Sequence, residues 1–231
     1  MANINPIRRA EIGREKRART RAQLIAAASA LFARQAVEAV TVDDVIREAG
    51  VAKGTFYVHF EDLHALIVSV ADELVATIDE LLQPVRLSIE DPALRIAYGC
   101  SCFIDKALSD PAWAGLAARM ASTTAKGGEV ARRRLYEDLK RHAKRLPPGS
   151  ASAELSLEIV VGILLQVLGA IAEGRLSSRH REEALAAILR AIGLDVRQVK
   201  SVLTSLPTQA DAVQPRLHGR AVKPRRATPG G

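Results

Sequence analysis

The sequence predicts an all-α protein, with a small N-terminal domain of three helices followed by a larger helical bundle. Two observations support this fold class. Alanine and leucine are abundant while aromatic residues make up only 3% of the chain, a composition that favours helices over sheets. Apolar residues also recur three and four positions apart, the period of an amphipathic helix. With 231 residues, the chain can bury a sizeable core.

The two ends of the chain are basic. Residues 1–22 and 195–231 each carry a charge of +5, so residues 23–194 carry −3 of the total charge of +7. Neither end has helical periodicity throughout, and we predict a disordered arm over 1–20 and a disordered tail over 195–231. Basic ends suggest contact with phosphates. For the C-terminal tail, solubility alone explains the charge equally well.

Three helices are expected between residues 21 and 66. The first packs one apolar face, formed by Leu24, Ile25, Ala28, Leu31 and Phe32. The second begins at Thr41, whose hydroxyl can cap free amide groups, and ends at Gly50, because glycine adopts the left-handed C-terminal conformation without strain. The third follows almost at once. Two short helices joined by a tight turn with glycine are typical of a helix-turn-helix.

The stretch from Thr41 to Phe60 reads TVDDVIREAGVAKGTFYVHF and resembles the DNA-binding motif of the tetracycline-repressor (TetR) family. The matching residues are Thr41, Val45, Ala49, Gly50, Val51, Gly54, Thr55, Tyr57, His59 and Phe60. The close match covers residues 21–66. The resemblance implies a homodimeric transcriptional regulator, most often a repressor, that binds a palindromic operator in double-stranded DNA and releases it when a small-molecule effector binds.

The resemblance also implies which residues contact DNA. The set on the second motif helix is Ala52, Lys53, Gly54, Thr55, Tyr57 and His59, and Thr41 is expected at a phosphate. Lys53 can donate to guanine or to phosphate, and Thr55 can hydrogen-bond or touch a thymine methyl. Arg14, Arg17 and Arg19 precede the first helix and are expected in the minor groove or at phosphates. Phe56 and Phe60 are expected in the core.

Residues 67–194 are predicted to form the ligand-binding and dimerisation domain. Helices are expected over 61–82, 93–108, from 110 through Met120, and over 129–146, 154–172 and 181–192, with breaks at Pro84, Asp91-Pro92, Lys126-Gly127-Gly128 and Pro147-Pro148. The candidate pocket residues are Leu74, Ile78, Tyr98, Phe103, Trp113, Met120 and Ile163. In the family resembled, the last two helices pair between subunits, which makes Val160, Leu164, Val167, Leu168, Ile171, Leu185, Ile188 and Leu189 the candidate interface; some of them must also serve the chain's own core.

No catalytic motif is visible, and we expect neither enzymatic activity nor a cofactor nor a metal. Cys100 and Cys102 are interpreted as small core residues, with thiol sensing as the alternative. No signal peptide is visible, and the apolar run Ile159 to Ala172 is too short to span a bilayer, so a cytoplasmic protein is expected. Two other functions stay open: a ligand-independent protein that coats DNA, and a helical small-molecule-binding protein whose motif is incidental.

Overall fold

The computed structural model describes residues 6–124 and 127–207. Within these ranges the fold is all helical and contains no strand. The α-helices are α1 (Pro6–Arg34), α2 (Val42–Ala49), α3 (Lys53–His59), α4 (Leu63–Ser88), α5 (Pro92–Ser109), α6 (Pro111–Thr123), α7 (Glu129–Ala143), α8 (Ala153–Ala172), α9 (Arg181–Ala191) and α10 (Val196–Thr204). Two short 3₁₀ helices, η1 (Val37–Ala39) and η2 (Ser178–His180), precede α2 and α9.

Two consecutive helices of the body begin in the same way. Asp91 and Asp110 are the N-cap residues of α5 and α6, and each carboxylate accepts a hydrogen bond from a backbone N–H three residues later. The proline that follows each aspartate occupies the first helical position, where the missing N–H costs nothing. The sequence alone therefore determines where α5 and α6 start.

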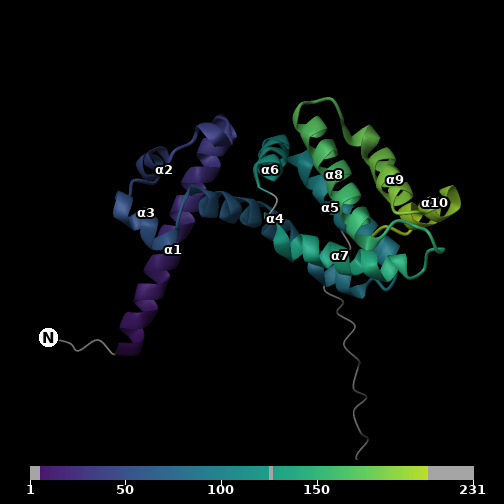
Figure 1. The fold of residues 1–231 in the computed structure, drawn as a ribbon, viewed down its shortest axis with the longest axis horizontal. Helices are drawn as coiled ribbons and strands as arrows, with labels where there is room; N and C mark the ends of the chain where they lie inside the picture. The colour runs from purple at the N-terminus through teal and green to yellow at the C-terminus, as the bar shows by residue number, and fades with distance from the viewer. Residues whose placement is uncertain (1–5, 125–126, 208–231) are drawn as a thin grey trace, which may run out of the picture.

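The helices form an N-terminal unit and a body, and α4 runs between them (Figure 1). Helices α1 to α3 pack with the start of α4 around an N-terminal core of buried side chains: Leu24, Phe32, Val45, Phe56, Phe60, Leu66 and Val70 among others. The body packs α5 to α10 around a second core that includes Ile96, Ile104, Leu139, Val160, Leu168, Leu185, Ile188 and Leu189. Leu116 and Met120 of α6 belong to the N-terminal core, so the body contacts that unit directly.

The structure corrects three boundaries. Residues 6–20, expected in a disordered arm, form the first half of α1. Pro84, expected to end a helix, lies inside α4, which continues to Ser88. The proline removes one backbone hydrogen bond, while the helix on either side of it is held by the buried side chains of Leu82, before the proline, and Arg86, after it.

The last correction concerns the C-terminal segment. Residues 195–207 contain the ordered helix α10, which begins with a capping box between Asp195 and Gln198 and buries Val199 and Val202. The rest of the predicted tail, 208–231, lies outside the described residues.

Helix α8 is by length and composition able to cross a membrane, with a mean hydropathy of 2.2 over its most apolar window. The apolar run from Ile159 to Ala172, predicted to be too short to span a bilayer, is only part of this helix, which begins at Ala153 and includes Glu154 and Glu158. It packs against α5, α6, α7 and α9, which accounts for one side of its apolar surface. Only 28% of that window is buried within this chain.

Candidate nucleic-acid interface and internal cavity

The helix-turn-helix is defined by local hydrogen bonds at both ends of α2. Thr41 and Asp44 form a reciprocal capping box, in which the Thr41 hydroxyl accepts from the Asp44 N–H and the Asp44 carboxylate accepts from the Thr41 N–H at 3.0 Å. The Thr41 side-chain hydrogen bond lowers the pKa of Asp44. At the other end Gly50 has φ 66°, a left-handed conformation that glycine adopts without strain. The predicted start and end of α2 are thus confirmed.

The core fixes the orientation of α3. Phe56 and Phe60 are buried beneath it, as predicted. The Arg21 guanidinium of α1 lies 5.0 Å from the Phe60 ring centroid and donates to Ser69 Oγ of α4 at 2.8 Å. Gln23 Nε2 donates to the Ala49 carbonyl at 2.6 Å. Helix α1 therefore ties together the end of α2, the end of α3 and the start of α4.

The opposite face of α3 is open to solvent. Among the predicted DNA contacts, Ala52, Lys53, Gly54 and Tyr57 are exposed, while Thr55 and His59 are half-buried. Val58, which the sequence analysis did not select, is 70% exposed. An exposed aliphatic side chain at this place suits a thymine methyl group. The sequence could have indicated Val58 in one way: Phe56 and Phe60 already supply the core face, so a further apolar residue between them is left to face solvent or a partner.

A carboxylate lies beside the first residue of α3. Lys53 Nζ donates to Asp43 Oδ1 of α2 at 3.0 Å, and this hydrogen bond raises the pKa of Lys53. Both side chains are more than half exposed, so the pair contributes little to folding stability. The structure thus adds Asp43 to the candidate interface.

The predicted basic arm is a helical extension. Arg14, Arg17 and Arg19 are exposed on α1, which extends past α2 and α3 (Figure 1). Arg14 and Arg17 share one side of the helix because they are three residues apart, whereas Arg19 points elsewhere. A helix cannot thread the minor groove as an extended arm does, so phosphates are the DNA groups that these side chains suit.

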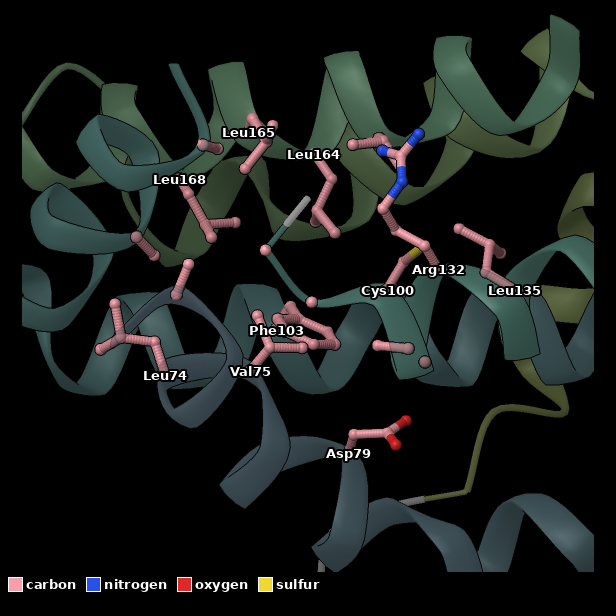
Figure 2. A pocket seen from close by; sticks show the side chains of 18 of the residues that line it. Leu74, Val75, Asp79, Cys100, Phe103, Arg132, Leu135, Leu164, Leu165 and Leu168 are labelled. Carbon is pink, nitrogen blue, oxygen red and sulfur yellow. The ribbon is translucent and has the colours of Figure 1, made fainter. Parts of the chain in front are cut away.

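A cavity of about 190 Å³ lies inside the body. Figure 2 shows Leu164, Leu165 and Leu168 of α8 on one side of it and Leu74, Val75 and Asp79 of α4 on the other, with Phe103 of α5 between them. Four of the predicted pocket residues line it: Leu74, Phe103, Trp113 and Met120. Trp113 and Phe103 have ring centroids 6.3 Å apart.

The other three predicted pocket residues do not line the cavity. Ile78 and Tyr98 are buried together in a separate cluster with Leu82 and Ile89, because they face away from the cavity on α4 and α5. Ile163 packs against the body core. Helical periodicity identifies apolar residues but does not determine which neighbour each one meets.

Charged side chains that the sequence analysis did not select also line the cavity. Arg86 donates to Asp138 Oδ2 from Nε at 3.2 Å and from Nη2 at 2.5 Å, and Arg95 Nη1 donates to Asp138 Oδ1 at 3.1 Å. Asp79 accepts from Arg134. The sequence does contain a signal for these charged residues. The helical spacing of α4 places Asp79 and Arg86 on the face that also carries the apolar lining residues Ala71, Leu74 and Leu82.

The wall of the cavity is shared with the N-terminal core. Ala71, Leu74 and Met120 line the cavity and also pack in or against that core. The adjacent Arg119 donates from Nη2 to the carbonyl of Phe32, at 3.3 Å, near the end of α1. A molecule in the cavity would therefore touch side chains that support the helix-turn-helix.

The two cysteines differ in position but both are poor nucleophiles. Cys100 is buried on the cavity wall, and burial raises its pKa to about 12. Burial also raises the pKa of Cys102. Because the thiolate is the reactive form, this environment favours the interpretation as core residues over thiol sensing.

Known proteins share both the motif and the fold. Residues 24–70 match the family described as "Bacterial regulatory proteins, tetR family". The fold is similar to that of RolR in complex with the ligand resorcinol, with a TM-score of 0.60 and 24% identity over 84% of this chain and 98% of that chain. It is also similar to SmeT, the repressor of the Stenotrophomonas maltophilia multidrug efflux pump SmeDEF, with a TM-score of 0.56 and 17% identity over 74% of this chain and 89% of that chain.

A third similar structure is NalD, described as the secondary repressor of the MexAB-OprM multidrug efflux pump in Pseudomonas aeruginosa. Its TM-score is 0.54 at 18% identity, over 76% of this chain and 96% of that chain. These three similarities cover both the helix-turn-helix and the helical body.

Proposed function

Because this chain is a DNA-binding transcriptional regulator of the TetR family, we propose that it is a cytoplasmic repressor that binds a palindromic operator as a homodimer and leaves it when a small molecule occupies the cavity. The observation that carries the proposal is the shared wall formed by Ala71, Leu74 and Met120. It joins a ligand-sized cavity to the core on which α3 rests.

Helix α3 is the element that reads DNA in this proposal. Its exposed face presents Lys53 and Tyr57, and its buried face is fixed by Phe56. A rigid helix with donors on its free face suits the major groove, where guanine offers two acceptors. Gly54 adds no side chain, so the helix backbone can approach the DNA closely.

A second copy of the chain is expected to cover the outer side of α8. Six of the eight predicted interface residues are unsuited to this role, because Val160, Leu168, Ile171, Leu185, Ile188 and Leu189 are buried in the chain's own core. Leu164 lines the cavity, and Val167 is half-buried.

The outward face of α8 instead carries Leu155, Gly162 and Gln166, which are exposed, and the half-buried Ile159. In an apolar helix that is mostly unburied within one chain, this is the face that we assign to the dimer.

Gly162 gives a direct test of that interface. A Cβ at this residue meets nothing within 4 Å, so Gly162→Arg should leave the subunit folded and place a charge on the proposed interface. We expect monomers by light scattering and a loss of operator binding. Leu87→Arg, at an exposed site on α4, is the matched control and should stay dimeric. A Gly162→Arg protein that is still dimeric would place the interface elsewhere.

Effector release requires different affinities in two conformations. A molecule in the cavity weakens DNA binding only if it prefers the arrangement of helix-turn-helix units that fits the operator poorly. Resorcinol is the ligand of RolR, whose structure resembles this one. A small molecule with an apolar body is accordingly the kind of effector that we propose for the cavity.

The DNA function is tested by selecting binding sites from a random pool at near-physiological salt. We expect a palindrome, and we expect Lys53→Ala/Tyr57→Ala to lose it while remaining folded. Binding without a consensus and with a steep salt dependence would favour a DNA-coating protein. Unchanged DNA affinity in the double variant would refute the assignment of α3 as the reading helix.

A further inference from the structure

The cavity is polar at one end and apolar at the other. Arg86, Arg95 and Asp138 line it near the C-terminal end of α4, and Ala71 and Met120 line it where it meets the N-terminal core. The rise along α4 from residue 71 to residue 86 is roughly 22 Å, at 1.5 Å per residue. The cluster of Arg86, Arg95 and Asp138 and the apolar wall at Ala71 and Met120 therefore lie near opposite ends of the stretch of α4 that lines the cavity.

The two other charged residues of the lining have partners of their own. Asp79 accepts from Arg134, and Arg132 donates to Glu158 at 2.6 Å. Because Asp79 and Arg132 are already paired, the charged group that a ligand would meet is the cluster of Arg86, Arg95 and Asp138.

This cluster has more positive than negative charge. The side chains of Arg86 and Arg95 are only 11% and 15% exposed, and both face the single carboxylate of Asp138, which is 3% exposed. Arg95 uses its other donors on the Ile89 carbonyl at the end of α4. Arg141 also approaches Asp138, at 3.5 Å, from a largely exposed position. A buried guanidinium without a full counter-charge is unfavourable unless another anion pairs with it.

Arg86 also has an unused donor. Its Nε and Nη2 both donate to the same oxygen of Asp138, and its Nη1 makes no hydrogen bond to any residue in the described part of the chain. Among those residues, every fully buried side-chain nitrogen or oxygen has a hydrogen-bond partner. Because Arg86 Nη1 has none, it is not fully buried and a ligand can reach it. Because Arg86 lines the cavity, Nη1 can donate to a ligand there.

We propose that the effector is an amphipathic organic anion, whose carboxylate pairs with Arg86 and Arg95 and whose apolar body extends toward Met120. The inference rests on the proposed function, which assigns the effector to this cavity. A carboxylate supplies the missing negative charge and matches the planar geometry of a guanidinium, an amide supplies no charge, and an amine adds repulsion.

The two ends of the ligand would then have different effects. The carboxylate determines affinity, because its partners lie far from the helix-turn-helix. The apolar end determines release from DNA, because Met120 and Leu74 also pack with the N-terminal core. Hexanoate should thus bind through the same carboxylate contacts as octanoate but release less DNA at equal occupancy.

Trp113 makes the binding measurement direct. It is the single tryptophan of the chain and it lines the cavity, so its fluorescence reports occupancy. The probes are octanoate and 3-phenylpropionate, each with its matched amide and amine. We expect both acids to change the fluorescence with affinities at least about tenfold above those of the amide and amine, the loss that follows when a charge-assisted hydrogen bond is removed.

Variants at Arg86 test the carboxylate site. Arg86→Met should abolish the preference for acids over amides, and Arg86→Lys, which keeps the charge, should retain part of it. Arg181→Met is the control, because it breaks an ion pair with Asp105 outside the cavity. Circular dichroism identifies any variant that fails to fold, and in that case the Arg86→Lys comparison decides.

Three results would overturn the inference: equal affinity for acid and amide, a preference for acids that survives in folded Arg86→Met, or failure of both acids to bind. Operator binding is measured in parallel. Acids that bind without affecting DNA affinity would leave the ligand class standing and refute the proposed release. Release of DNA by an amine but not by an acid would refute the proposed ligand class and leave the proposed release standing.

Discussion

Lys53 Nζ and Asp43 Oδ1 lie 3.0 Å apart, so the first residue of α3, the helix that we propose reads DNA, is held by a carboxylate of α2. In the DNA complex this carboxylate would lie near phosphates, and it reduces the effective positive charge that Lys53 presents. Asp43 is therefore expected to weaken binding in general and to limit the bases that Lys53 can read.

Replacing Asp43 with asparagine should strengthen DNA binding. We expect an increase of about two- to tenfold at low salt, and a steeper salt dependence by about one ion, because Lys53 is freed for the DNA. Fluorescence anisotropy at several salt concentrations measures both quantities. Glu173→Gln, which removes a carboxylate from an ion pair in the body, is the charge-matched control and should change neither. Weaker binding of Asp43→Asn would mean that the carboxylate orients Lys53 productively.

Two residues of α3 that lie on opposite faces, Phe56 and Val58, should respond differently to truncation. Phe56 is fully buried, so Phe56→Ala is expected to lower the free energy of unfolding by about 3–5 kcal/mol. Val58 is largely exposed, and Val58→Ala should change stability by less than about 0.5 kcal/mol while reducing operator affinity. Urea unfolding and anisotropy separate the two effects. Unchanged operator affinity in Val58→Ala would remove this residue from the interface.

Stability should fall in mildly acidic solution because of His142. Its ring Nε2 lies 3.1 Å from the Ile192 carbonyl, and burial lowers its pKa below the ordinary value of 6.5. The folded state therefore resists protonation while the unfolded state accepts a proton at about pH 6.5. Stability from this residue is fully present above that pH and is lost as the pH falls from there toward the folded-state pKa.

Thermal unfolding from pH 8 to pH 5 tests this assignment. The decline below about pH 6.5 should become smaller in His142→Gln, because the folded and unfolded states no longer differ in protonation at this site. His64→Gln, at an exposed histidine, should keep the decline. An unaltered decline in His142→Gln would assign it to other groups.

The cysteines should be protected from thiol reagents. With the pKa of Cys100 raised to about 12, its thiolate population at pH 8 is very small. We expect modification of Cys100 to be more than about a hundredfold slower in the folded protein than in urea. Mass spectrometry of reacted peptides distinguishes it from Cys102. Rapid labelling of Cys100 in the folded protein would restore thiol sensing as a function.

The local structure of the helix-turn-helix follows from the amino-acid sequence. Thr41, Asp44 and Gly50 act through hydrogen bonds and backbone conformations within a few residues, so their roles were readable from spacing alone. The same is true of the Asp-Pro starts of α5 and α6, and of the buried faces of short helices such as the one that holds Phe56.

The neighbours of the body helices, in contrast, depend on how the whole chain packs. Arg86 and Asp138 are 52 residues apart in the chain, and their pairing in the cavity wall depends on how α4 and α7 pack. Periodicity also placed Ile78 and Tyr98 on apolar faces, yet they pack in a cluster of their own. Val160 and Leu185, expected at a dimer interface, are covered within one chain. An apolar stripe predicts that one side of a helix is buried. Which helix covers that side depends on how all the neighbouring helices pack together, and the stripe alone does not contain this information.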